Sequence, residues 1–440
     1  MTTPSRRIAA AIAAMPLFAF STQYAFAQTP AKIDAADTAW IMTATALVLM
    51  MTLPGLALFY AGMVRKKNML ATMAQSLVAV MLVSVLWAIV GYSLVFGGDG
   101  PIIGTFSRAF LNGIGMESTH PLAKTIPEAL FMIYQMTFAV ITVALVSGSV
   151  ADRMRFSAFV WFAALWFLFV YVPIAHWVWG GGFLGAAGVL DFAGGLVVHL
   201  NCGVAGLVAA LVLGARRGYG HENLAPFNLT LAVIGTGMLW VGWFGFNGGS
   251  ALSAGSRAAM AIVVTHLAAC AGALAWMFLE WWTRSKPSVL GMISGAIAGL
   301  GTITPAAGFV MPTQGLIIGV IAGAVCFWAC TWLKLKLGYD DSLDVFGVHG
   351  VGGLTGTLLV GVFAVAAVSA TPEVAGTSGL LEGNPGLVLT QLYGVAVTLI
   401  WSGAVTFILL KVIGFMVPLR VTQQQEVEGL DITQHGEALQ

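Results

Sequence analysis

Long apolar runs recur along almost the whole chain and constrain its fold more than any other feature. Eleven of them are long enough to cross a bilayer as a helix of about 20 residues. Of the 440 residues, 59% are apolar and only 8% are charged, too few charges to cover a soluble fold of this size. The 19 Lys and Arg residues nearly balance the 18 Asp and Glu residues, which argues against a nucleic-acid-binding protein. The sequence therefore predicts an all-α polytopic membrane protein.

We predict eleven transmembrane helices and an orientation for them. The predicted spans are 40–63, 69–97, 127–150, 156–175, 192–214, 227–246, 257–281, 289–307, 316–333, 346–369 and 387–415. With the N-terminus outside, the predicted cytoplasmic segments carry thirteen Lys and Arg residues and the outer segments four, as the positive-inside rule requires. The predicted C-terminus is therefore cytoplasmic, in the inner membrane of the cell.

The chain ends supply the remaining domain boundaries. Arg6 and Arg7 precede a short apolar stretch, and Ala25-Phe-Ala27 offers a cleavage site. This pattern is typical of a secretory signal peptide, and an uncleaved first helix is the alternative. We predict a signal peptide over residues 1–27, a transmembrane domain over 28–416 and a cytoplasmic C-terminal tail over 417–440.

Two segments of the chain share one pattern. The fifth predicted span contains Asp191 followed by Val-His199-x-x-x-Gly-x-x-Gly, and the tenth contains Asp344 followed by the same motif at His349. The histidines are 150 positions apart, and the two spans run in opposite directions. This predicts two inverted five-helix repeats plus a final helix, with the functional site between the halves near the bilayer midplane. Chance similarity of glycine-rich helices is the alternative.

The polar residues inside the spans suggest which cargo would cross. A histidine inside a membrane is usually functional, and His199 and His349 are the strongest candidates. We interpret His176 as a structural residue, and for His266 a structural role and a functional role are both left open. No chain of carboxylates crosses the membrane, no nucleotide-binding loop is present, and the four cysteines fall in apolar runs, so we predict no disulfide, no metal site and no cofactor. A path lined by imidazole, aromatic rings and hydroxyls suits a small neutral molecule, or a cation that loses its charge before crossing.

Aromatic and hydroxyl side chains gather at the predicted outer ends of the helices. Trp179 follows the fourth span, Tyr134 and Phe138 share a face of the third, and Phe246 and Ser250 end the sixth. Aromatic faces attract cations by about 0.5–2 kcal/mol. The alternative is an ordinary interfacial belt of aromatic residues.

Several stretches of the sequence resemble the ammonium transporter family (Amt/Mep/Rh), and within it the bacterial Amt branch. They are Leu53-Pro-Gly-Leu-Ala-Leu-Phe-Tyr-Ala-Gly62, Asp152-Arg-Met-Arg-Phe-Ser157, Pro173-Ile-Ala-His-Trp-Val-Trp-Gly-Gly-Gly182, Asp191-Phe-Ala-Gly-Gly-Leu-Val-Val-His199, Gly242-Trp-Phe-Gly-Phe-Asn247, Asp344-Val-Phe-Gly-Val-His-Gly350 and Glu428-Gly-Leu-Asp431. The resemblance covers essentially the whole mature chain and implies a transporter of ammonium, with methylammonium as an analogue.

The resemblance also implies roles for single residues. Trp179, Phe138 and Ser250 match the positions that recruit ammonium in an outer vestibule, and we place Tyr134, where relatives often carry Phe, among these substrate-binding residues. Phe138 and Phe246 match two stacked rings that close the pore, His199 and His349 match the histidine pair below them, and Asp191 matches an aspartate that supports the vestibule. Relatives are homotrimers, and a PII-class signalling protein often blocks their cytoplasmic face.

Three other classes of function fit the sequence less well. A channel for another small neutral solute would gain nothing from a cation-attracting vestibule. An ammonium sensor would need an output, and the tail that ends at Gln440 is short. An enzyme is disfavoured because neither histidine has carboxylates at metal-site spacing and no nucleophile triad is apparent.

Overall fold

The computed structural model describes residues 32–371 and 374–439. Within these ranges every regular element is a helix, and short segments of π- or 3-10-helix, labelled η, interrupt the α-helices. The predicted signal peptide, residues 1–27, lies outside the described residues.

Ten helices long and apolar enough to cross a membrane are present in the described part of the chain, and one shorter apolar helix makes eleven, as the sequence predicts. They are formed by α1 (Ala35–Met50), η1 (Met51–Leu56) and α2 (Ala57–Met63); η2 (Lys66–Asn68), α3 (Met69–Leu86), η3 (Trp87–Gly91) and α4 (Tyr92–Phe96); α5 (Glu128–Val150); α6 (Phe156–Trp166), η5 (Phe167–Tyr171), α7 (Val172–Trp179) and α8 (Phe183–Ala186); η6 (Gly195–Leu200) and α9 (Asn201–Leu213); α10 (Leu229–Trp243) and η7 (Phe244–Gly248); α11 (Ser256–Arg284); α12 (Val289–Ile303); α13 (Pro312–Trp328), η8 (Ala329–Leu333) and α14 (Lys334–Leu337); η9 (Phe346–Gly350) and α15 (Val351–Phe363); and α17 (Gly386–Met416). The eighth, α12, has only 15 residues.

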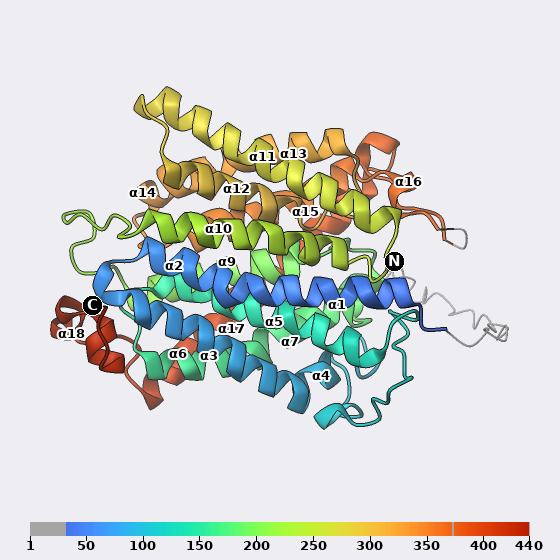
Figure 1. Cartoon of the computed structure of the whole chain (residues 1–440), viewed down its shortest axis with the longest axis horizontal. Coiled ribbons are helices and arrows are strands. Elements are labelled where there is room, and N and C mark those ends of the chain that lie inside the picture. The colour runs from blue at the N-terminus through green and yellow to red at the C-terminus, as the bar shows by residue number, and fades with distance from the viewer. Residues whose placement is uncertain (1–31, 372–373, 440) are drawn as a thin grey trace, which may run out of the picture.

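Short helices complete the loops and the tail. They are η4 (Ala109–Leu111), α16 (Ala366–Ser369), η10 (Leu380–Glu382), α18 (Gln423–Glu428) and η11 (Asp431–His435). Figure 1 shows α11 and α13 along one flank of the bundle and α3 and α6 along the other, with α5 and α9 between them. The start of α1 and the helix α18 lie at opposite ends of the bundle. We call the end that carries residues 417–439 the tail end, and the opposite end the vestibule end.

The two repeats cross where their shared motif lies. Helix α9 packs against η9, and α15 packs against η6. A Cβ atom at Gly203 would lie 2.2 Å from the Cα of Gly350, and one at Gly353 would lie 2.7 Å from the backbone nitrogen of Leu200. Gly203 and Gly353 are 150 positions apart, and so are their partners Leu200 and Gly350. Each repeat therefore contacts the other through the same position of the motif, as expected for inverted repeats. Only glycine at both positions allows the backbones to approach this closely.

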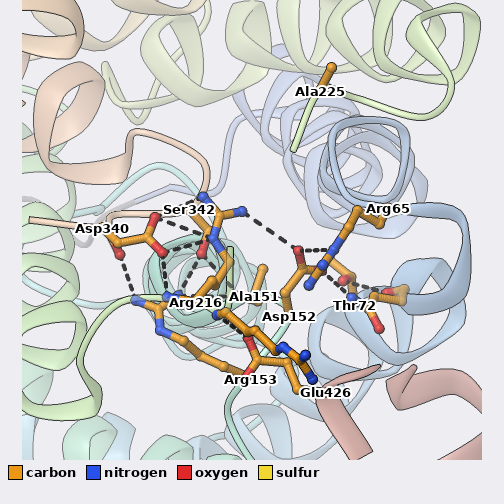
Figure 2. A network of polar contacts seen from close by, with 12 residues as sticks. Arg65, Thr72, Ala151, Asp152, Arg153, Arg216, Ala225, Asp340, Ser342 and Glu426 are labelled. Carbon is orange, nitrogen blue, oxygen red and sulfur yellow. Dashed lines mark hydrogen bonds and ion pairs between the residues drawn. The ribbon is translucent and has the colours of Figure 1, made fainter. Parts of the chain in front are cut away.

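Buried charges join the loops at the tail end (Figure 2). The guanidinium group of Arg216 lies 2.7 Å from Asp340 and 3.6 Å from Asp152, and Arg65 lies 3.1 Å from Asp152. Arg153 is fully buried and donates to the Asp340 carbonyl oxygen. Although burial pulls the pKa of the Asp340 carboxyl upward, its hydrogen bonds and charge contact with Arg216 hold that pKa below the usual value. The network fixes the loop that leads into η9.

The tail packs against the same loops. The Glu426 carboxylate accepts hydrogen bonds from the Arg217 backbone at 2.7 Å and from Arg420 at 2.8 Å. The Asp431 carboxylate accepts from the backbone nitrogen of Ala71 at 2.8 Å, at the start of α3. The tail is therefore an ordered part of this end of the protein.

Candidate functional site

Three cavities follow one another through the bundle. The first, at the vestibule end, has a volume of about 260 Å³ and includes Phe138 in its wall. The second, of about 10 Å³, is lined by Phe246, His199 and His349. The third, of about 20 Å³, shares His349 with the second and reaches Asp344 toward the tail end. A volume of about 10–15 Å³ holds a single water, so the narrow part of this path fits a molecule of the size of ammonia.

The first cavity contains most of the residues predicted for recruitment. Its wall is formed by Phe96, Leu122, Phe131, Gln135, Phe138, Val178, Trp179, Phe192, Ser250 and Leu252. The indole N–H of Trp179 donates to the Asp191 carbonyl oxygen at 2.8 Å, which fixes the ring. The Ser250 hydroxyl donates to the Phe246 carbonyl oxygen at 2.8 Å. Its lone pairs therefore remain able to accept a hydrogen bond from a ligand.

Tyr134 lies behind this wall. Its ring is completely buried and meets the Phe138 ring edge-on, with centroids 5.1 Å apart. Its hydroxyl lies 3.0 Å from the carbonyl oxygens of Gly245 and Phe246 and 3.4 Å from the Ser250 hydroxyl. Tyr134 thus holds the end of η7 in position, and it is absent from the residues that line the cavity.

Two phenyl rings separate the first cavity from the second. The ring centroids of Phe138 and Phe246 are 4.4 Å apart, and the planes are inclined by 32°. Trp179 packs edge-on against Phe138 at 5.7 Å. The rings thus lie between two cavities that are separate in this structure.

The two histidines meet directly beneath these rings. Their Nδ1 atoms are 3.2 Å apart, and their planes differ by only 10°. This separation is that of a hydrogen bond, in which one Nδ1 must donate and the other accept. The paired rings therefore carry opposite tautomers, and their Nε2 atoms comprise one donor and one acceptor. The His199 Nε2 is buried and has no protein partner.

Trp243 completes the pair and was missed from the sequence. Its ring stacks on His199 with centroids 5.5 Å apart and planes 15° apart, and its N–H donates to Thr304 at 2.9 Å. The signal lay in the motif of residues 242–247, where Trp243 and Phe246 are three positions apart and so share a helix face.

Aspartates set the start of both helices that carry the histidines. The Asp191 carboxylate accepts hydrogen bonds from the backbone nitrogens of residues 194, 195, 196 and 197 at 2.6–3.1 Å. These N–H groups would otherwise lack a partner at a helix start. Asp344, at the matching place before the second helix, does not cap it, because its carboxylate accepts from Lys334. Asp341, which is fully buried, accepts from the Phe346 backbone at 2.7 Å, whereas Asp344 has a φ of 58° and precedes the helix.

Other histidines lie off the path. The ring nitrogens of His176 are 2.7 and 2.5 Å from two backbone carbonyl oxygens, which confirms the structural reading. His120 stacks on Phe131 behind the first cavity, and burial lowers the pKa of its imidazole. His266 accepts a hydrogen bond from the Trp240 indole at 3.2 Å on the exposed side of α11.

Comparisons with known proteins identify the family of the chain. Residues 39–439 match the model of the Ammonium Transporter Family. The chain is 48% identical to the ammonium transporter of Bacillus subtilis over 401 residues, which span 91% of this chain and 97% of the relative.

Solved structures give the same answer. The crystal structure of Candida albicans Mep2 superposes with a TM-score of 0.84 at 37% identity, covering 90% of this chain and 88% of that one. A structure named Sensor Amt Protein superposes with a TM-score of 0.82 at 28% identity, covering 91% and 98%. The matched family and the Bacillus subtilis relative are named for transport of ammonium, so the family is one of transporters rather than enzymes. The chain is thus a multi-pass membrane protein that belongs to the ammonium transporter family.

Proposed function

We propose that the protein recruits ammonium in the first cavity, removes a proton at the phenyl rings and conducts ammonia past the histidine pair. The observation that carries the proposal is the hydrogen-bonded pair His199–His349 in a cavity of about 10 Å³ beneath the closed rings of Phe138 and Phe246. Each step follows from the chemistry of the residues on the path.

Recruitment rests on replacing part of the water around the cation. The faces of Trp179 and Phe138 attract ammonium by about 0.5–2 kcal/mol each, and the Ser250 oxygen accepts one of its hydrogen bonds. Tyr134 acts as a positioning residue for Ser250 and Phe246. The wide first cavity of about 260 Å³ leaves room for a partly hydrated cation.

Deprotonation follows from the cost of charge in the narrow cavity. An ion without its hydration shell is strongly destabilised in an apolar environment, and the residues around the histidines are mainly apolar. Neutral ammonia has no such penalty. It has both a lone pair and N–H donors, so it can satisfy the unpartnered Nε2 of His199 as it passes.

The released proton has two routes. It crosses along the histidine pair, which offers one donor and one acceptor nitrogen, or it stays at the vestibule end. Currents from proteoliposomes distinguish them, because only the first route moves charge. On the first route, pulses of ammonium and of methylammonium evoke currents and pulses of potassium evoke none. Equal currents for potassium and ammonium would refute the proposal, and swelling assays would test the neutral-solute alternative.

The proposal includes the cellular setting. The tail end is cytoplasmic and the vestibule end faces outward in the inner membrane, because the predicted cytoplasmic segments carry most of the Lys and Arg residues. Residues 1–27 are removed as a signal peptide. These assignments are tested by cysteine labelling of the two ends in intact cells.

We propose that the protein is a homotrimer. His266 is exposed in the middle of α11, between exposed apolar residues such as Val263 and Leu274. A polar ring facing lipid is unfavourable, whereas a neighbouring copy would cover it. A PII-class protein would bind the tail end, where the buried charges hold the loops in place and the ordered tail adds to a fixed surface. Native mass spectrometry of the purified protein tests the trimer, and co-purification with a PII-class protein tests the partner.

A further inference from the structure

The third cavity reaches Asp344, which pairs with Lys334, and the proposed mechanism uses neither residue. This cavity, of about 20 Å³, shares Phe59, Ile297 and His349 with the cavity of the histidine pair and has Asp344 in its wall. The cavity also includes Cys330, and Lys334 lies one helical turn further along the same side of η8 and α14. The end of the path is therefore next to a charged pair.

Lys334 is held by two oxygen atoms at this place. Its Nζ lies 2.6 Å from the carbonyl oxygen of Asp341 and 2.7 Å from the carboxylate of Asp344. The Lys334 side chain is 13% exposed, whereas that of Asp344 is 34% exposed. The carboxylate thus remains accessible while the ammonium group of the lysine is largely enclosed.

The ε-ammonium group of lysine and the free ammonium ion are chemically alike. Both carry one positive charge on a tetrahedral nitrogen, and both offer several N–H donors. A carbonyl oxygen and a carboxylate oxygen lie within 2.7 Å of the lysine nitrogen, and these are acceptors that the free ammonium ion also requires. We propose that Asp341 and Asp344 form an ammonium site at the tail end of the path, and that Lys334 occupies it as a tethered competitor.

Occupancy of the site by Lys334 affects how ammonium enters the path from the tail end. This inference rests on the proposed function, since it concerns the same path. Ammonium that reaches the tail end must compete with a group whose effective concentration is about millimolar or higher. Lys334 therefore keeps the cation away from His349 on this side. Ammonia that leaves the path gains its proton in the solution beyond.

A substitution of the lysine separates this role from simple packing. Lys334→Met keeps most of the length of the side chain, ends one atom short of the Nζ position and removes the charge. Lys336→Met is the matched control, because Lys336 lies on the same short helix and its Nζ lies 4.5 Å from the centroid of the Trp332 ring, away from the pair. The double variant Lys334→Met with Asp344→Asn removes the released site as well.

The assay is uptake of labelled methylammonium into right-side-out and inverted membrane vesicles without a membrane potential. For Lys334→Met, we expect the concentration for half-maximal uptake from the tail end to fall about tenfold, as when a competitor at about ten times its dissociation constant is removed. The maximal rate of uptake from the tail end falls by the same factor. This follows because, in a passive path, the ratio of the maximal rate to the half-saturating concentration is the same in both directions. The value at the vestibule end stays within about twofold, a difference of about 0.4 kcal/mol.

The control variants give the decisive outcomes. Lys336→Met keeps wild-type values at both ends, and the double variant loses the tighter binding of Lys334→Met. Unchanged half-saturation at the tail end in a well-expressed Lys334→Met would refute the inference, as would tight binding that persists in the double variant. If Lys334→Met does not reach the membrane, Lys334→Gln replaces it with the same expectation. A wild-type protein that carries no methylammonium in either vesicle would instead refute the proposed function.

Discussion

The crossing of the two repeats predicts that a single methyl group, placed away from the path, strongly slows transport. In Gly203→Ala the new Cβ would lie 2.2 Å from the Gly350 Cα, whereas ordinary contact begins at 3.4 Å. The facing atoms are backbone, so no side chain is able to turn away. The helices must therefore separate by at least the difference between these distances, 1.2 Å.

This separation reaches the histidine pair because His349 precedes Gly350 directly. If the shift is passed on in full, the Nδ1 atoms of His199 and His349, now 3.2 Å apart, move to about 4.4 Å, beyond hydrogen-bonding distance. Overpacking of this kind costs about 1–3 kcal/mol, and a misplacement of about 1 Å lowers rates by up to about 100-fold.

The assay combines ammonium-evoked current with thermal unfolding in detergent. We expect Gly203→Ala to fold with a lowered unfolding temperature and to lose at least about tenfold in current, equivalent to about 1.4 kcal/mol. Gly237→Ala is the matched control, since nothing lies within 4 Å of its new methyl group. Wild-type current and stability in Gly203→Ala would show that the crossing is not as tight as described.

Three further changes test other parts of the structure. Asp191→Ala removes the acceptor of four backbone N–H groups, so we expect a loss of about 1–3 kcal/mol or more in stability together with lost transport; an unchanged unfolding temperature would contradict the capping role. Tyr134→Phe removes a hydroxyl that binds backbone oxygens, worth about 0.5–1.5 kcal/mol, and should raise the methylammonium concentration for half-maximal uptake by less than about tenfold. Complete loss of transport would indicate direct contact with the substrate. Arg216→Met leaves Asp340 without its main partner, a loss of about 3–5 kcal/mol. Because the pKa of Asp340 is lower in the folded protein, its stabilising contribution is complete above the unfolded pKa of about 3.9 and disappears as the pH falls through the folded pKa. We expect the unfolding temperature of Arg216→Met to lack this dependence on pH. Identical profiles of unfolding temperature against pH in the wild type and the variant would exclude the contribution of Asp340.

The sequence predicts the spans and the histidine pair well because both depend on local patterns. Hydropathy and helix length locate ten of the eleven spans as helices of 18 residues or more, and the shared motif around His199 and His349 determines which side chains meet. The motif works because its glycines permit the helix crossing that brings the rings together.

Features that depend on contacts between distant segments escaped prediction. Asp344 precedes its helix in the same way as Asp191, yet the chain turns at Asp344 with a φ of 58° and leaves the capping role to Asp341. Likewise, the stacking of Trp243 on His199 joins the sixth span to the fifth. Tyr134 has the helical spacing of a vestibule residue, but its hydroxyl turns to the backbone of η7.

The most direct test of the account is the ammonium-evoked current of His199→Ala in proteoliposomes, compared with His266→Ala. His199 shares a hydrogen bond with His349 on the path, whereas His266 binds Trp240 on the exposed side of α11. We predict that His199→Ala abolishes the current or admits potassium, and that His266→Ala in folded protein conducts as the wild type does. Wild-type current and ammonium selectivity in His199→Ala would contradict the role of the paired imidazoles in the path.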